Sequence, residues 1–81
     1  MTAYARAGVD EEAVLDGETL LRRGDRLYRL DVPATTVWRL LPGDAETIGH
    51  AIAETLGEPA DRVVADVAAL LERLAADGLV E

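Results

Sequence analysis

Polar and apolar residues alternate along the first half of the chain and predict a small antiparallel sheet. A first strand, Ala13-Val14-Leu15, runs into Asp16-Gly17, a dipeptide suited to a two-residue hairpin because glycine tolerates positive φ. A second strand is expected over Glu18 to Arg22, and Arg23-Gly24-Asp25 is expected to turn the chain again. Arg26 to Leu30 then forms the third expected strand.

The alternation gives this third strand two different faces. Tyr28 and Leu30 fall on one face, and Leu27 and Arg29 fall on the other. Residues 1–10 have no clear pattern, and the sequence leaves open whether they form an arm or an irregular extra strand.

From Asp31 onward the apolar positions recur with helical spacing. Asp31 can cap a first helix, which ends before Pro42-Gly43. Asp44 can cap a second helix, which ends at Gly57. One apolar face is expected on each, made by Ala34, Val37, Trp38 and Leu41 on the first helix and by Ala45, Ile48, Ile52, Thr55 and Leu56 on the second.

A third and longest helix is expected from Pro59 to about Asp77, where Gly78 stops it, and Leu79-Val80 either returns as a terminal strand or packs as a staple. At 100° per residue its apolar arc spans about 160°, against roughly 100° for a helix that packs one face on a core. Around Val67 the arc has two sides, formed by Val63, Leu70 and Leu74 and by Val64, Ala68 and Ala75. Either the core covers both sides, or part of the arc lines an open groove.

Length and composition favour one folded α+β domain over residues 1–81. The chain is 49% hydrophobic and 30% charged, too apolar for a disordered protein and too interrupted by charge for a membrane span. Its N-terminus does not combine basic residues with an apolar run of signal-peptide length, so we expect a cytoplasmic protein without membrane association.

Catalytic residue types are scarce in this sequence. It contains no Ser, Cys, Lys, Asn, Gln or Phe, which excludes serine and cysteine nucleophiles, a Schiff-base lysine and the serine that a carrier protein needs for its phosphopantetheine arm. The one histidine, His50, falls opposite the apolar face of its helix and is expected to be exposed. Acidic pairs such as Glu11-Glu12 are expected to form a solvated face. We therefore expect no enzyme activity, metal site or cofactor.

The charge distribution argues against nucleic acid as a partner. Eight basic residues face sixteen acidic ones, and residues 42–81 carry a net charge of −7 out of the total of −8. A helix that reads DNA needs basic residues to displace counterions from phosphate, whereas the third expected helix is itself acidic. A small winged-helix DNA-binding regulator remains the alternative function, and an interaction subunit of a larger enzyme is a third possibility.

Four arginines gather on the second hairpin of this acidic protein. Arg22, Arg23, Arg26 and Arg29 surround Asp25, which gives a local charge of +3 within eight residues. Charged side chains of this kind protect an exposed strand from pairing with copies of itself. Equally, the third strand can be an edge that accepts one particular peptide by strand addition, with the arginines attracting its acids.

Three motifs in order carry a family resemblance. They are Leu27-Tyr28-Arg29-Leu30-Asp31, Ala34-Thr35-Thr36-Val37-Trp38-Arg39-Leu40-Leu41, and Asp66-Val67-Ala68-Ala69-Leu70-Leu71-Glu72-Arg73-Leu74 followed by Gly78-Leu79-Val80. From about Val14 to Val80 the chain resembles the coenzyme PQQ synthesis protein D family (PqqD-like), also called RiPP precursor peptide recognition elements. The Pro-Ala-Asp-Arg-Val-Val-Ala-Asp-Val run and the short length are most similar to stand-alone members of lasso-peptide pathways.

The resemblance implies a winged-helix-like fold, a three-stranded antiparallel sheet followed by three helices, and a binding function without catalysis. The leader of a ribosomally made precursor peptide would lie along the third strand, against the third helix. The protein would deliver it to a leader peptidase and an ATP-dependent macrolactam synthetase. On the third helix, the resemblance places Val64, Ala68, Leu71 and Ala75 on the groove side and leaves Val67, Leu70 and Leu74 mainly to the core. The implied peptide-binding residues are Arg26, Leu27, Tyr28, Arg29, Leu30, Val64, Val67, Ala68, Leu71 and Ala75.

Overall fold

The computed structural model describes residues 2–81 and contains a three-stranded antiparallel sheet followed by three helices. The sheet has the order β2 (Glu11–Leu15), β3 (Glu18–Arg23), β4 (Arg26–Leu30). The helices are α1 (Val32–Leu40), α2 (Ala45–Leu56) and α3 (Ala60–Ala76). Two short strands, β1 (Ala3–Tyr4) and β5 (Gly43–Asp44), pair with each other outside this sheet. The predicted α+β fold class is confirmed.

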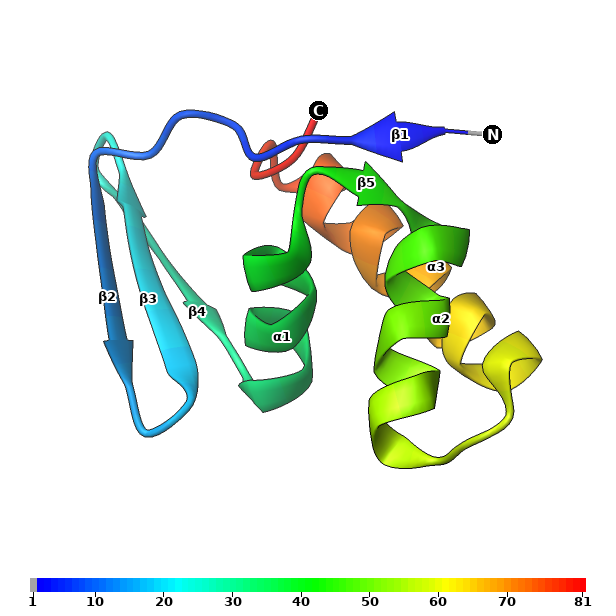
Figure 1. The fold of residues 1–81 in the computed structure, drawn as a ribbon. Coiled ribbons are helices and arrows are strands. Elements are labelled where there is room, and N and C mark those ends of the chain that lie inside the picture. The colour runs from blue at the N-terminus through cyan, green and yellow to red at the C-terminus, as the bar shows by residue number, and fades with distance from the viewer. Residues whose placement is uncertain (1) are drawn as a thin grey trace.

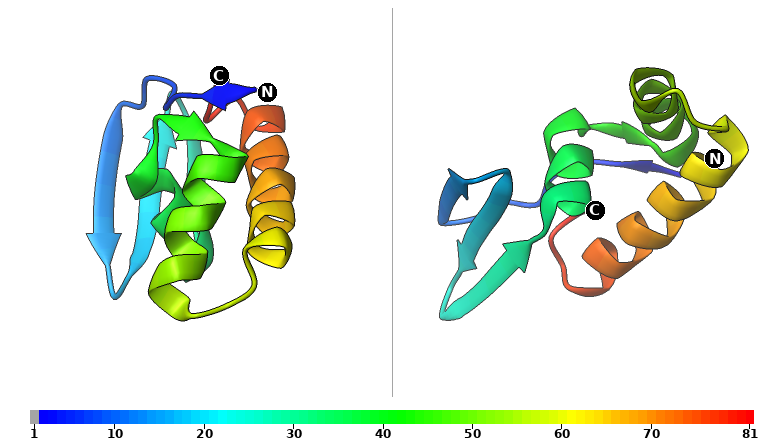
Figure 2. Two further views of the ribbon diagram at one scale, coloured as in Figure 1. Left: turned by 45° about the vertical axis from the view of Figure 1, so that its right-hand side comes forward. Right: turned by 90° about the horizontal axis from the view of Figure 1, so that it is seen from below.

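Helix α1 stands between the sheet and the pair formed by α2 and α3 (Figure 1). The view from below in Figure 2 shows the same order, with β4 and α3 on either side of α1. Strand β4 leads directly into α1, because Leu30 ends the strand and Asp31 already caps the helix. This connection fixes the end of β4 relative to the helical layer.

The two hairpins follow the predicted turns, with slightly longer strands. Asp16 and Gly17 both have positive φ, 54° and 79°, as a two-residue hairpin turn with matching twist requires. Strand β2 begins at Glu11 instead of Ala13. This extension is stabilised across the sheet, because Glu11 pairs in register with Arg22 and accepts a 2.8 Å hydrogen bond from its Nε.

The predicted caps are present at both helix starts. The Asp31 carboxylate accepts from the Ala34 N–H at 2.9 Å, and the Asp44 carboxylate accepts from the Thr47 N–H at 2.7 Å. One part of the predicted α2 face is wrong: the Thr55 and Leu56 side chains are exposed. The last turn of α2 extends beyond the first turn of α1, so α1 does not cover it (Figure 1).

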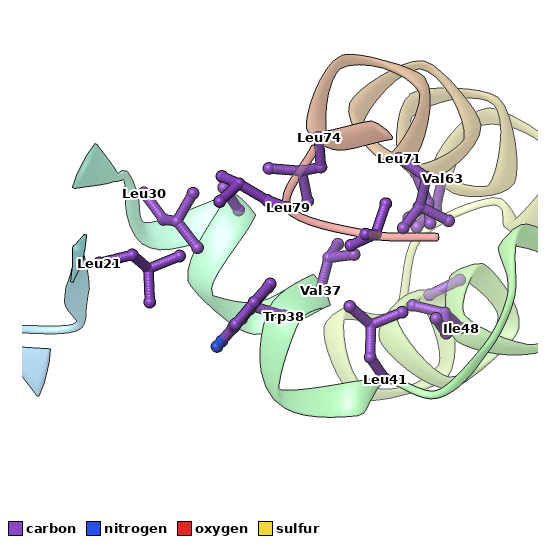
Figure 3. Packing of buried hydrophobic residues seen from close by; sticks show 14 residues of the cluster. Leu21, Leu30, Val37, Trp38, Leu41, Ile48, Val63, Leu71, Leu74 and Leu79 are labelled. Carbon is purple, nitrogen blue, oxygen red and sulfur yellow. The ribbon is translucent and has the colours of Figure 1, made fainter. Parts of the chain in front are cut away.

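The core fills the space between the inner face of the sheet, the three helices and the C-terminal residues (Figure 3). Trp38 is 1% exposed, and its indole Nε1 donates to Glu12 Oε1 at 3.1 Å. The buried apolar residues of this cluster are Leu21, Leu30, Ala34, Val37, Trp38, Leu41, Ile48, Ala53, Val63, Val67, Leu71, Leu74, Leu79 and Val80. The core thus contacts every layer, and β4 and α3 meet through it.

The N-terminal segment forms an extra strand that joins the two ends of the chain. Strand β1 pairs with β5. Farther along, Ala5 and Glu81 exchange two backbone hydrogen bonds, of 2.7 and 2.9 Å, and the Ala7 N–H donates to the Leu79 carbonyl at 2.9 Å. The prediction for residues 1–10 left open an arm or an irregular extra strand; in the described part, residues 2–10, the extra strand is found, and Leu79-Val80 folds back against this segment.

Candidate functional site

Strand β4 is an edge strand whose free main-chain groups can be assigned from the pairing register. The Arg22 carbonyl accepts from the Asp10 N–H at 2.8 Å, so the main-chain groups of Arg22 point away from β4. Leu27 faces Arg22 in the β3–β4 pair and does not exchange ladder hydrogen bonds with it. The N–H and C=O groups of Leu27, and of Arg29 two residues later, therefore point out of the free edge.

An open hollow of about 500 Å³ lies between the end of β4 and the C-terminal half of α3. Its lining residues are Arg29, Leu30, Asp31, Leu70, Arg73, Leu74 and Asp77. Leu30 and Leu74 are buried beneath it, on either side of Leu79 in the view of Figure 3. Leu70 is half-buried, and the charged residues are exposed at the rim. The hollow therefore combines an apolar base with a charged rim beside an unpaired strand edge.

Two of the rim charges are already engaged. Arg29 Nη2 donates to Glu18 Oε2 at 2.8 Å on the outer face of the sheet. This hydrogen bond and the carboxylate charge raise the pKa of the Arg29 guanidinium, which stays protonated in any case. Asp31 is held as the cap of α1. A chain laid along β4 would thus meet an apolar wall with fixed charges around it.

Residues 10–80 match the family described as Coenzyme PQQ synthesis protein D (PqqD). The chain belongs to the PqqD family. Members of this family are non-catalytic accessory proteins that bind precursor peptides of ribosomally synthesised and post-translationally modified peptides (RiPPs) and act with modifying enzymes. Neither the curated proteins nor the solved structures gave a match, so the winged-helix likeness stays a prediction.

The β4 residues of this PqqD protein lie as their alternation predicts. Leu27 is 77% exposed on the outer face, together with Arg29. Tyr28 is half-buried and Leu30 is 5% exposed on the inner face. Arg26 is exposed at the start of the strand. Whether these residues contact a peptide stays a prediction.

The predicted division of α3 into core and groove sides is wrong at two positions. Leu71 was assigned to the groove, but it is 0% exposed and lies in the core. Leu70 was assigned to the core, but it is half-buried and lines the hollow. The cause is α2, because Gly49 lets that helix approach Val64 and cover its side of α3.

The other predicted α3 residues fall on different sides of the helix. Val67 is 4% exposed in the core, Val64 and Ala68 are half-buried on the side nearer α2, and Ala75 is exposed. Of these, none lines the hollow. The sequence signal for the side of α3 that lines the hollow is the mixed face of Leu70, Arg73, Leu74 and Asp77, where apolar and charged residues share one helical stripe.

A second shallow hollow lies at the start of α2, lined by Asp44, Glu46, Thr47 and His50. The His50 side chain is 59% exposed, as predicted, and its Nε2 is 4.0 Å from Glu46 Oε1. Within residues 2–81 no cluster of three or more metal-ligating side chains is found. In the same part of the chain no helix has the length and apolar character needed to span a membrane.

Proposed function

We propose that this PqqD protein binds the leader segment of its precursor peptide as an added strand along the free edge of β4, against α3. The observation that carries the proposal is the outward direction of the Leu27 and Arg29 main-chain groups next to the hollow. The backbone of an extended peptide can form hydrogen bonds with the main-chain groups of both residues. Its affinity would come from those hydrogen bonds and its selectivity from side chains placed in the hollow.

Alternate side chains of the added strand would point inward. Those beside Leu30 would contact the apolar base, with Leu70 and Leu74 as the α3 wall. Leu71 supports this wall from the core without contacting the peptide. The peptide-binding set is therefore revised to Arg26–Leu30 on β4 together with Leu70, Arg73 and Leu74 on α3.

A proline substitution tests the strand edge with little harm to the fold. Leu27→Pro removes an N–H that points away from β3, so no ladder hydrogen bond is lost. A fluorescently labelled leader, synthesised from the precursor gene next to this one, should bind the wild type and lose at least tenfold in affinity with the variant. The matched control is Val14→Pro, which removes an outward N–H from the opposite edge strand and should bind normally.

The groove wall is tested separately by Leu70→Asp, with Leu20→Asp as control on the outer face of the sheet, where Leu20 is 50% exposed. The first variant should weaken leader binding by at least tenfold and the second should leave it unchanged, while circular dichroism shows both folded. Equal binding by all these proteins would contradict the proposed site. Leu71→Asp is unsuitable, because a charge at a buried position destabilises the fold.

The leader would be handed to a leader peptidase and an ATP-dependent macrolactam synthetase, as in lasso-peptide biosynthesis. Support for this finer assignment comes from the sequence run Pro59 to Val67. Neighbouring genes for a short precursor, a small cysteine-type peptidase and an asparagine-synthetase-like enzyme are expected. Co-purification of the peptidase with this protein in the presence of leader would support the assignment, and neighbouring genes of a different RiPP class would contradict it.

A further inference from the structure

Four of the eight arginines are held by side-chain contacts. Arg6 donates to the Trp38 carbonyl, Arg23 to the Gly78 carbonyl, and Arg22 and Arg29 form ion pairs with Glu11 and Glu18. The remaining four make no ion pair within 4.0 Å and no side-chain hydrogen bond to any residue in the range 2–81. They are Arg26, Arg39, Arg62 and Arg73.

Two of these unpaired arginines flank the gap between β4 and α3. Arg73 lines the hollow from the last turn of α3. Arg26 faces Arg23 across the β3–β4 pair, and opposed residues project from the same face of a sheet. Since Arg23 reaches the Gly78 carbonyl just after α3, Arg26 projects toward the same end of that helix. One unpaired arginine therefore lies on each side of the gap, Arg26 on β4 and Arg73 on α3.

The surrounding charges leave these two cations available to a ligand. Arg29 is neutralised by Glu18, and Asp31 is engaged as a helix cap, so Asp77 is the one rim acid without such a role. Residues 42–81, which include the α3 side of the hollow, carry a net charge of −7, and this acidic surface repels an acidic peptide. An acidic side chain on the added strand would therefore gain the most binding free energy beside Arg26 and Arg73.

We propose that the bound leader carries an acidic residue on its inward face, opposite Arg26, and that its carboxylate pairs with both Arg26 and Arg73. This inference rests on the proposed strand addition at β4. Inward positions recur every second residue, so the position opposite Arg26 is four residues from the position opposite Leu30, whichever way the strand runs. The leader signature is therefore an acid and an apolar residue separated by three residues.

A selection from displayed random 12-residue peptides tests this signature without knowledge of the natural leader. Peptides are selected on the wild type and on a variant carrying Arg26→Glu and Arg73→Glu. Wild-type binders should be enriched in Asp or Glu four positions from an apolar residue. Binders of the charge-reversed variant should have Lys or Arg at that same position. A control with Arg39→Glu and Arg62→Glu should select acidic peptides like the wild type.

One selected peptide and its Glu→Lys form then complete a charge-swap cycle. Matched pairs should bind, and mismatched pairs should be roughly tenfold weaker, because an attraction is replaced by a repulsion. If the selected peptides lose affinity for Leu27→Pro but bind equally well whatever the charge at positions 26 and 73, this inference alone is overturned. Peptides that also bind Leu27→Pro at full strength would overturn the strand-addition proposal with it.

Discussion

At the residue scale, a buried pair of hydroxyl groups fixes the end of β4. Thr35 Oγ1 lies 3.2 Å from the Leu30 carbonyl and 2.9 Å from Thr19 Oγ1. Because the Thr35 hydroxyl donates its single hydrogen to Leu30, the Thr19 hydroxyl donates to Thr35. Thr19 and Thr35 are 0% and 3% exposed, so water cannot replace either bond. These contacts connect β3, β4 and α1 directly below the hollow.

Removing the Thr35 hydroxyl should destabilise the fold markedly. Thr35→Val keeps the shape but leaves the buried Thr19 hydroxyl without a partner and removes the side-chain hydrogen bond to the Leu30 carbonyl, which should lower the free energy of unfolding by about 1–3 kcal/mol. Urea denaturation followed by circular dichroism measures this. The control is Thr36→Val, whose hydroxyl is exposed and bonds the Val32 carbonyl, and its effect should stay within about 0.5 kcal/mol. Equal effects of the two substitutions would refute the role of the buried pair.

The Asp44 cap should contribute to the pH dependence of stability. Hydrogen bonds from the Thr47 backbone and side chain hold the pKa of Asp44 below its usual range. Because this pKa is lower in the folded state than in the unfolded chain, the stabilisation is complete above the ordinary value of about 3.9 and is lost as pH falls through the lowered one. In Asp44→Asn the amide keeps a cap oxygen but cannot ionise.

Denaturant unfolding of the wild type and Asp44→Asn at pH 7 and at pH 3 checks this expectation. The wild type should be the more stable protein at pH 7, and the difference in unfolding free energy should shrink at pH 3, which lies below the ordinary Asp pKa of about 3.9 in the unfolded chain. A difference that is the same at both pH values would show that ionisation of Asp44 does not stabilise the fold.

At the element scale, the close contact between α2 and α3 decides which side of α3 is open. A Cβ at Gly49 would lie 2.7 Å from the Val64 Cα, so only glycine permits this approach. The sequence shows the wide apolar arc of α3 but not which side another helix covers, since that depends on packing between segments. The β4 strand and both helix caps depend on local sequence, and for this reason they were predicted correctly. The core and groove assignments of Leu70 and Leu71 depend on the position of α2, and they were predicted the wrong way round.

Gly49→Ala should force α2 and α3 apart. Alanine favours a helix by up to about 1 kcal/mol over glycine, but overpacking against a backbone atom costs about 1–3 kcal/mol. We expect the Tm to fall by several degrees in thermal unfolding. Gly8→Ala is the control, because an added Cβ there has no atom within 4 Å, and its Tm should be unchanged or higher. A Tm of Gly49→Ala at or above the wild-type value would contradict the close approach.

At the scale of the whole molecule, the termini and the middle of the chain are joined on one side, and the β4 edge and α3 remain open on another (Figures 1 and 2). Some of these long-range contacts have no local sequence signal. Glu12 was expected to be merely solvated, yet it accepts from the indole of Trp38, 26 residues away. Arg6 lies 5.1 Å from the ring centroid of the same tryptophan. The terminal strand is therefore part of the framework that holds β4 and α3 in place.

Hydrogen exchange at the two sheet edges, followed by NMR with and without leader peptide, tests the central claim most directly. In the free protein the Leu27 and Arg29 amides should exchange quickly, because they point out of the β4 edge. Saturating leader should slow both, while the Glu12 and Val14 amides, which point out of the β2 edge, should exchange as before. Binding that leaves Leu27 and Arg29 unprotected, or that protects the β2 edge instead, would contradict strand addition at β4.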